Sequence, residues 1–302
     1  MLPTTVPCGV RTFLDNWSLP RSPGRLVRRV PSVARQRLGS LAVLILLPPS
    51  EGKAAAHRGR PLDLEGLAFA SLNPTRQAVA DALVRLAHGP AAKAQQVLGI
   101  SAKQTEELKR NADLWSSPAA PASQIYTGVL YDALDYPTLS ASQRRRAGTD
   151  VAIASALFGL LRPGDKIPAY RLSGDTTLPG VGRLATAWRE PMSDAISAAA
   201  KRGVVLDLRS SAYVALGPVP AELADRTAVA RVLQEKDGKR SVVSHHNKAT
   251  KGRLVRSLLT EPRPTSIPDL AGALGEAGYR TELQPPRRDG QPWSIDVIVE
   301  EI

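Results

Sequence analysis

The strongest constraint on the fold is an Asp-Gly turn between two strand-like runs. Residues Val229–Glu235 and Lys239–His245 flank Lys236-Asp237-Gly238, and Asp-Gly between two such runs is typical of a tight antiparallel hairpin. The sequence therefore predicts at least one antiparallel strand pair.

Two short apolar runs, Val43–Leu47 and Val204–Leu208, have the length and composition of buried strands. Segments with helical periodicity lie between them and after them. Because helices separate well-spaced strands while one strand pair is antiparallel, we expect an α/β fold with a mixed sheet and helices packed on it. The expected helices cover about residues 73–114 with a break at 88–90, then 140–145, 149–161, 184–201, 250–260 and 267–277, and a last strand covers 293–300.

Residues 1–42 differ from the rest of the chain in charge. They contain seven arginines and one acid, Asp15, and so contribute half of the net charge of +12. Their Arg, Pro and Ser content, without apolar periodicity, predicts a disordered extension. Three origins stay open: a transit peptide, a basic tail that adds non-specific nucleic-acid affinity, or an extended reading frame whose true start lies near Val43. We expect residues 43–302 to form a single domain.

Charge and cysteine content limit the classes of function. A pI near 10.2 suits a polyanionic partner or an anionic substrate. The single cysteine, Cys8, allows no intrachain disulfide and no cysteine-based metal site, which fits a cytoplasmic protein. The apolar run Leu41–Leu47 is too short to span a membrane. We expect no cofactor, no metal and no membrane partner, and the oligomeric state is not indicated.

A basic segment follows the expected hairpin. From Lys248 to Arg256 the chain places four cations and no acid in nine residues, at the start of an expected helix. Lys251 lies on the same side of that helix as the core-facing Leu258, and lysines on the buried side of a helix entrance line a cleft or snorkel to its mouth. The segment is either a solvated helix end or part of an anion-binding cleft. The preceding His245-His246 would face opposite sides of a strand, so we predict no metal site there.

The turn Gly99–Gln104 is a second candidate for phosphate contact. A helix is expected to end at Gly99, and Ser101 with Gln104 has the spacing of a capping box for the next helix. Two helices joined by an apolar-Gly-apolar turn resemble a helix–hairpin–helix, whose turn amides contact DNA phosphates, although Ser101 replaces the second glycine of that pattern. An ordinary capped helix pair is the alternative.

Polar residues also follow both apolar strands. The loop Ser50-Glu51-Gly52-Lys53 lacks the first glycine and the final Ser/Thr of a phosphate loop, so nucleotide binding is not predicted, but Lys53 stays a candidate cation. The segment Asp207–Tyr213 follows the second strand, at the place where ligands commonly bind in α/β sheets.

In this order, six segments resemble the YaaA-type peroxide-stress protein family, and the resemblance covers residues 43–302. They are Leu44–Lys53, Tyr126–Gly128, Ala154–Asp165, Pro168–Leu172, Asp207–Tyr213 and Asn247–Arg256. Two positions depart from the family pattern. Ser173-Gly174-Asp175 stands where Glu-Met-Gly is frequent, and Lys251 replaces a frequent arginine, which keeps the charge but loses bidentate geometry.

The resemblance implies a cytoplasmic bacterial protein of the hydrogen-peroxide response that limits free iron. It also implies an unusual α/β fold with a basic cleft, a helix–hairpin–helix element and DNA binding. The DNA- or anion-binding residues carried over by position are Lys53, Tyr126, Arg162, Tyr170, Arg171, Ser210, Tyr213, Lys248, Lys251 and Arg256, with Gly99, Ser101 and Lys103 in the helix pair.

Two functions from different classes follow. The leading hypothesis is a DNA-binding stress protein that recognises the phosphate backbone by shape. The alternative is an enzyme that acts on a phosphorylated or nucleotide-like substrate in the same cleft, with Asp207, Ser210 or Tyr213 carrying the chemistry. Iron sequestration is not supported, because residues 43–302 contain no cysteine and no carboxylate–histidine cluster with ligand spacing.

Overall fold

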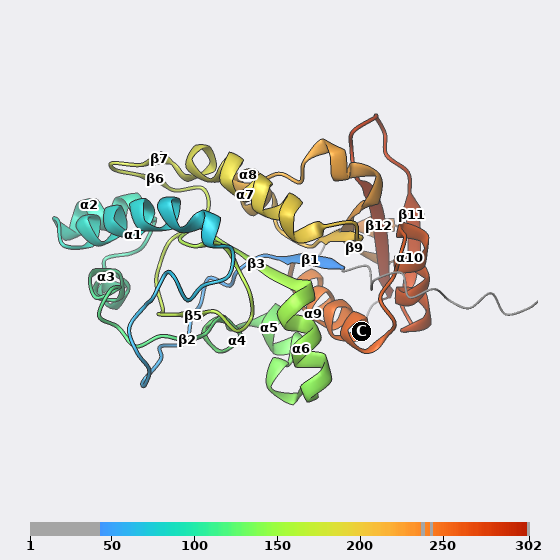
Figure 1. The fold of residues 1–302 in the computed structure, drawn as a ribbon, viewed down its shortest axis with the longest axis horizontal. Coiled ribbons are helices and arrows are strands. Elements are labelled where there is room, and N and C mark those ends of the chain that lie inside the picture. The colour runs from blue at the N-terminus through green and yellow to red at the C-terminus, as the bar shows by residue number, and fades with distance from the viewer. Residues whose placement is uncertain (1–42, 237–238, 242–243, 301–302) are drawn as a thin grey trace, which may run out of the picture. The chain divides into compact units, whose positions relative to one another are not determined.

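The structure, a computed structural model, describes residues 43–236, 239–241 and 244–300 (Figure 1). The expected disordered extension over residues 1–42 lies outside them. Within the described residues, an eight-stranded sheet has the order β11-β12-β9-β8-β1-β3-β4, and β10 pairs with β9. The strands are β1 (Leu44–Leu47), β3 (Val151–Ser155), β4 (Gly159–Leu161), β8 (Val205–Asp207), β9 (Thr227–Lys236), β10 (Lys239–Ser241), β11 (Arg280–Gln284) and β12 (Trp293–Glu300).

The central five strands, β12-β9-β8-β1-β3, are mutually parallel, whereas β4, β10 and β11 are antiparallel to their neighbours. The expected mixed α/β sheet is therefore confirmed. All residues of β1 and β3 are buried, as expected of parallel strands that helices cover on both faces. Outside this sheet, β2 (Ala120–Pro121) pairs with β5 (Lys166–Ile167), and β6 (Thr177–Leu178) pairs with β7 (Gly182–Arg183).

Helices lie on both faces of the central strands. Figure 1 shows α7 and α8 on one side, and α5, α6 and α9 on the other. The α-helices are α1 (Asn73–Ala87), α2 (Ala91–Leu98), α3 (Thr105–Ala112), α4 (Ala122–Ile125), α5 (Val129–Leu134), α6 (Ala141–Asp150), α7 (Leu184–Ala200), α8 (Ser211–Leu216), α9 (Ser244–Thr260) and α10 (Ile267–Glu276). Three 3-10 helices cover Ala70–Leu72, Tyr136–Thr138 and Ala221–Arg226.

The predicted hairpin is confirmed in its register, which pairs Lys236 with Lys239 across a two-residue turn. The turn residues themselves lie outside the described part of the chain. The second strand is shorter than expected and ends at Ser241, and α9 already begins at Ser244. His245-His246 therefore belongs to the first turn of α9, and its placement on a strand was wrong.

The helix expected over residues 149–161 is also wrong. This alanine-rich run forms β3 and β4, an antiparallel pair at the edge of the parallel strands. Every residue from Val151 to Leu161 is buried, so the segment has no polar face, and an apolar run of this kind does not distinguish a buried strand from a buried helix.

One glycine permits the close approach of two helices. A Cβ on Gly252 of α9 would lie 2.1 Å from the carbonyl oxygen of Leu130 and 2.9 Å from the amide nitrogen of Leu134, both in α5. Only a residue without a side chain fits at this crossing. The contact fixes the basic segment of α9 against α5.

The strand order creates a topological switch point beside β1. The chain passes from β1 to β3 on one side, and it later returns to β8 on the other side. The connections therefore leave the carboxyl ends of β1 and β8 in opposite directions, which opens a crevice there. In open α/β sheets ligands bind in such crevices.

Candidate anion-binding site

A pocket of about 240 Å³ lies at this crevice. Its walls come from the loop that follows β1, from residues 171–175 and from the start of α8. Four residues predicted from the sequence line it together: Lys53, Arg171, Ser210 and Tyr213. The fold thus brings two cations and two hydroxyl groups from distant segments to one place.

Lys53 is held by its own loop. Its Nζ donates hydrogen bonds to the carbonyl oxygens of Ser50 (3.0 Å) and Glu51 (3.3 Å) and lies 4.4 Å from the centre of the Tyr170 ring. Burial and, second, the positive charge of Arg171 lower the pKa of Lys53 to about 8. Its amine therefore titrates within reach of physiological pH.

Arg171 is fixed through its backbone. The side chain of Asn111 in α3 donates from Nδ2 to the Arg171 carbonyl oxygen, and its Oδ1 accepts from the Arg171 N–H, both at 2.8 Å. The Arg171 guanidinium is less completely paired: Nε is buried and has no hydrogen-bond partner among the described residues. Its Nη1 forms a long ion pair, at 4.0 Å, with the carboxylate of Glu51, whose side chain is 84% exposed.

Two tyrosines form a layer beneath Lys53. The hydroxyls of Tyr126 and Tyr170 lie 2.9 Å apart, and Ser155 Oγ lies 2.7 Å from the Tyr170 hydroxyl. Both tyrosines are buried, and burial raises the pKa of each phenol well above its usual range. They therefore stay neutral and pair with each other, which suits a supporting layer better than direct ligand contact.

Ser210 and Tyr213 line the opposite wall at the start of α8. Ser210 is exposed, and Tyr213 is half-buried. Burial, followed by Tyr170 and the acids Glu51 and Asp175, raises the pKa of the Tyr213 phenol, so this hydroxyl keeps its proton and can donate it in a hydrogen bond.

The cations of the basic segment point to different places. Lys251 Nζ donates to the Leu208 carbonyl at 2.9 Å, and burial lowers its pKa against the opposing effect of Asp207. Arg256 caps the end of α5 by donating to the carbonyl oxygens of Leu134 and Asp135 at 2.9 Å. Lys248 is exposed. The sequence places both lysines at the start of an expected helix. Because α9 already begins at Ser244, Lys248 and Lys251 instead lie beyond its first turn.

Arg162 is also engaged within the fold. Its Nη1 donates to the Val151 carbonyl at 2.8 Å, and its guanidinium lies 4.8 Å from the centre of the Phe69 ring. Arg162 is thus not among the residues that line the pocket.

The helix pair is confirmed, but its predicted cap is not. Gly99 ends α2 in the left-handed conformation at φ 61°, and α3 begins only at Thr105, so Ser101 is not its N-cap. Gln104 Oε1 instead accepts from the Ser101 N–H at 2.9 Å within the loop. Ser101 and Lys103 are exposed there.

Asp207 is occupied by a buried ion pair. Its Oδ1 accepts from Arg209 Nε at 2.9 Å, and its Oδ2 accepts from Arg209 Nη2 at 2.7 Å. Both residues are buried. A carboxylate held at both oxygens by a guanidinium is a poor general base, which argues against the catalytic role considered for Asp207.

Residues outside the sequence prediction also contribute. Asn111 and Arg209 support the pocket walls, and Asn247 in α9 has a buried Oδ1 without a partner among the described residues. Asn247 lies one helical turn before Lys251, on the same side of α9. A single asparagine or arginine in a helix or strand end carries no motif, so only the three-dimensional contacts identify these residues.

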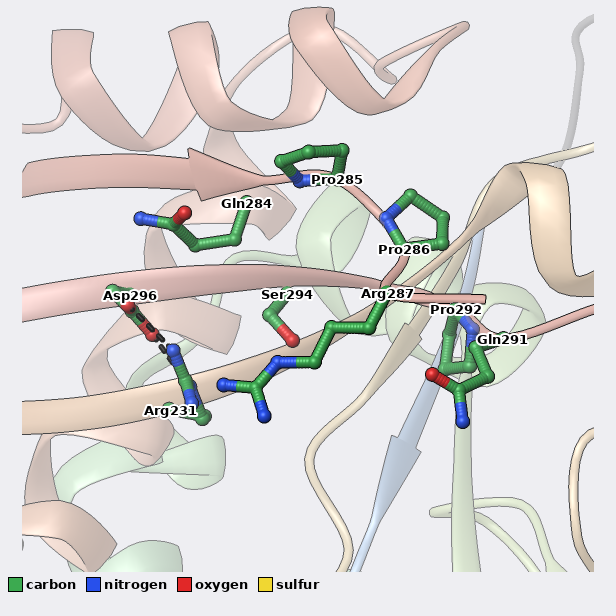
Figure 2. A pocket seen from close by; sticks show the side chains of 9 residues that line it. All are labelled: Arg231, Gln284, Pro285, Pro286, Arg287, Gln291, Pro292, Ser294 and Asp296. Atoms are coloured by element: carbon green, nitrogen blue, oxygen red, sulfur yellow. Dashed lines mark hydrogen bonds and ion pairs between the residues drawn. The ribbon is translucent and has the colours of Figure 1, made fainter. Parts of the chain in front are cut away.

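A second cavity, of about 460 Å³, lies over β9 and β12 (Figure 2). Figure 2 shows Arg231 paired with Asp296, and Arg287 extending over the same surface. Arg231 donates to both carboxylate oxygens at 2.6 and 2.7 Å. Its guanidinium is thus held by two short hydrogen bonds, whereas that of Arg171 has a long ion pair with Glu51 and an unpartnered Nε.

The described residues lack two further features. No helix there is both long enough and apolar enough to cross a membrane. No cluster of three or more His, Cys, Asp and Glu residues is placed to hold a metal ion.

Similar proteins match most of the length of the chain. A family profile described as peroxide stress protein YaaA matches residues 43–284. A UPF0246 protein of Streptomyces coelicolor is 48% identical over 261 residues, which cover 86% of this chain and 100% of the relative. A UPF0246 protein of Corynebacterium efficiens is 42% identical over 252 residues, which cover 82% of this chain and 98% of the relative.

Proposed function

Because the chain belongs to the peroxide stress protein YaaA family, we propose that it is a peroxide-stress protein that binds DNA through phosphates. The binding surface consists of two parts. One is the pocket of about 240 Å³ that Lys53 and Arg171 line, here called the Lys53–Arg171 pocket, and the other is the adjoining α2–α3 helix pair. Protection of DNA in this way would help to limit damage by free iron and peroxide.

One observation carries the proposal. Asn111 of α3 holds the backbone of Arg171, so the helix pair and the pocket cation belong to one connected unit. In the turn of the helix pair the amides of Gly99, Ile100 and Ser101 already donate within the fold, which leaves those of Ala102 and Lys103 to donate. Backbone amides and a recessed guanidinium are both groups that bind phosphate. Their connection supports a surface that contacts more than one phosphate.

The same geometry favours recognition by shape. Tyr126 and Tyr170 lie beneath Lys53 and are almost fully buried, so their rings are not available for stacking on bases. Contacts to phosphates fix the position of a protein on DNA but carry no direct sequence information. We therefore expect little sequence preference.

The test is fluorescence-anisotropy binding of the full-length chain to a short labelled duplex with phosphorylated ends over a salt series. Each phosphate contact contributes about 0.9 to the slope of log K against log salt. Arg171→Gln should reduce that slope by about 0.9 and weaken binding to all sequences alike. A chain that does not bind the duplex at low salt would contradict the proposal.

Two matched variants separate the pocket from general charge. Arg288→Gln removes one exposed arginine from the loop after β11 and should leave the slope within error. A second variant changes all seven arginines of residues 1–42 to glutamine. If that change alone abolishes binding, the affinity comes from the N-terminal segment, and the pocket is not a DNA site.

The enzyme alternative has weaker support. Of the three groups considered for chemistry, Asp207 is held by Arg209, which leaves Ser210 and Tyr213 at the pocket wall. No described base lies within hydrogen-bond distance of either hydroxyl. We therefore favour binding without turnover.

A further inference from the structure

We infer that the Lys53–Arg171 pocket holds a single terminal phosphate monoester, such as the one at a DNA end or on a free nucleotide, and not the diester of a continuous strand. The DNA source of this group rests on the proposed function. The chemistry of the group itself rests on the pocket alone.

The guanidinium of Arg171 is incompletely paired. The side chain is only 17% exposed, and its Nε has no described hydrogen-bond partner. Leaving a buried donor of a charged group unpaired costs free energy that a ligand acceptor would recover. Arg171 thus contributes a largely desolvated guanidinium to the pocket wall, and guanidinium groups bind phosphate through paired N–H donors.

The charged residues of the pocket differ in their exposure. Lys53 and Arg171 are partly buried in the pocket wall, whereas the two acids that also line it, Glu51 and Asp175, are exposed. Lys53 is held by two carbonyl oxygens and the Tyr170 ring, so it supplies charge from a fixed position. These two cations match a monoester, which carries about −1.5 to −2 charges at neutral pH.

The pocket also contains uncharged hydrogen-bond donors. A monoester presents three terminal oxygens, which are strong acceptors. The hydroxyls of Ser173, Ser210 and Tyr213 line the same pocket, and none of them has a hydrogen-bond partner among the described residues. Together with Arg171 they offer enough donors for all three oxygens.

The volume of the pocket suits a small ligand group. At about 240 Å³ the pocket is smaller than the roughly 300–1,000 Å³ that accommodate drug-sized ligands. Three protein segments wall it, and a terminal phosphate, which carries one ester link, needs less room there than a diester, which carries two.

The experiment compares duplexes of one sequence that end in a 5′-phosphate, a 3′-phosphate or hydroxyls only, in the anisotropy assay with the full-length chain. Thymidine 5′-monophosphate and thymidine are titrated in parallel by calorimetry. We expect a phosphorylated end to bind at least tenfold tighter than a hydroxyl end, and the monophosphate to bind where thymidine does not. Arg171→Gln should abolish both preferences, and Arg288→Gln should keep them.

The outcomes separate this inference from the proposed function. Discrimination by phosphorylated ends supports a DNA terminus as the source. Nucleotide binding that Arg171→Gln abolishes, without any duplex binding, supports the monoester site and overturns the proposed DNA function. Salt-dependent duplex binding with no preference for phosphate ends, and no nucleotide binding, overturns the inference while the proposed function stands. Arg171→Lys keeps the charge without the bidentate fork and guards against a folding defect in Arg171→Gln.

Discussion

Asn111 and Arg171, 60 residues apart in sequence, are joined by two hydrogen bonds of 2.8 Å between the side-chain amide of the first and the backbone of the second. Asn111 is fully buried, and its amide satisfies one donor and one acceptor of the loop that presents Arg171. The pocket thus depends on α3, although α3 contributes no residue to its walls.

Asn111→Ala should therefore destabilise the protein by about 2–4 kcal/mol, because it leaves a backbone N–H and a backbone C=O without partners. Urea unfolding measures the change. Lys109→Ala, at an exposed position of the same helix, should stay within about 0.5 kcal/mol of the unchanged protein. Equal stabilities for the two variants would mean that the two Asn111–Arg171 hydrogen bonds contribute nothing to stability.

Lys53 should make stability depend on pH in the alkaline range. Its pKa in the folded protein is about 8 and that of an unfolded lysine is about 10.4, so the unfolded state binds more protons between these values. The free energy of unfolding contributed by Lys53 should then rise with pH above 8, by at most about 1.4 kcal/mol per pH unit.

Lys53→Met removes this rise and provides the comparison. Unfolding curves of both proteins from pH 7.5 to about 9.5 avoid the ionisation of unfolded tyrosines near pH 10. The difference between the two stabilities should change steadily across this range. A constant difference would show that the pKa of Lys53 is not lowered.

The Asp207–Arg209 pair should act on stability. Asp207→Leu leaves the buried Arg209 charge uncompensated and should cost about 3–5 kcal/mol. The double variant Asp207→Leu/Arg209→Met replaces both charges by apolar groups and should recover much of that loss. Thermal and urea unfolding of the two variants checks this order, and a double variant no more stable than the single one would contradict it.

Gly252 and Gly272 form a matched pair of helical glycines. A Cβ on Gly252 would collide with Leu130 of α5, whereas a Cβ on Gly272 meets no atom within 4 Å. Gly272→Ala should stabilise the protein by about 0.5–1 kcal/mol through helix propensity, and Gly252→Ala should destabilise it because α5 and α9 must separate. A change in stability of the same sign for both substitutions would contradict this explanation.

Arg256 should prove a stabilising residue with little direct role in phosphate binding. Arg256→Ala removes the cap on the end of α5 and should cost about 1–3 kcal/mol, while the salt slope of DNA binding stays unchanged. Arg253→Ala, at an exposed position of α9, is the control for stability. A slope reduced by about 0.9 in Arg256→Ala would instead return Arg256 to the binding surface.

Patterns of short range could be predicted from the sequence. The Asp237-Gly238 signal predicts the β9–β10 register, and the apolar runs at 43–47 and 204–208 predict β1 and β8, because turn chemistry and uniform burial act on neighbouring residues. The run at 149–161 was misread because burial on all sides removes the polar residues that distinguish a strand from a helix.

Partners that are distant in sequence could not be predicted. Lys53 and Arg171 were expected as cations, but nothing in the sequence indicates that they share a pocket while Arg162 and Arg256 serve the fold. That difference depends on which carbonyl oxygens lie near each guanidinium once the sheet has formed. For the same reason the role of Asn111 becomes visible only in the folded structure.

The pairing of β1 with β8 has a consequence for the order in which the chain is made. At about 5–20 residues per second on the ribosome, the roughly 160 residues between the paired Leu44 and Val205 take about 8–32 s to synthesise. During that time one edge of an entirely apolar strand has no partner, and such an edge is a template for aggregation. This interior strand of the sheet therefore needs protection while the nascent chain grows, before its neighbour exists.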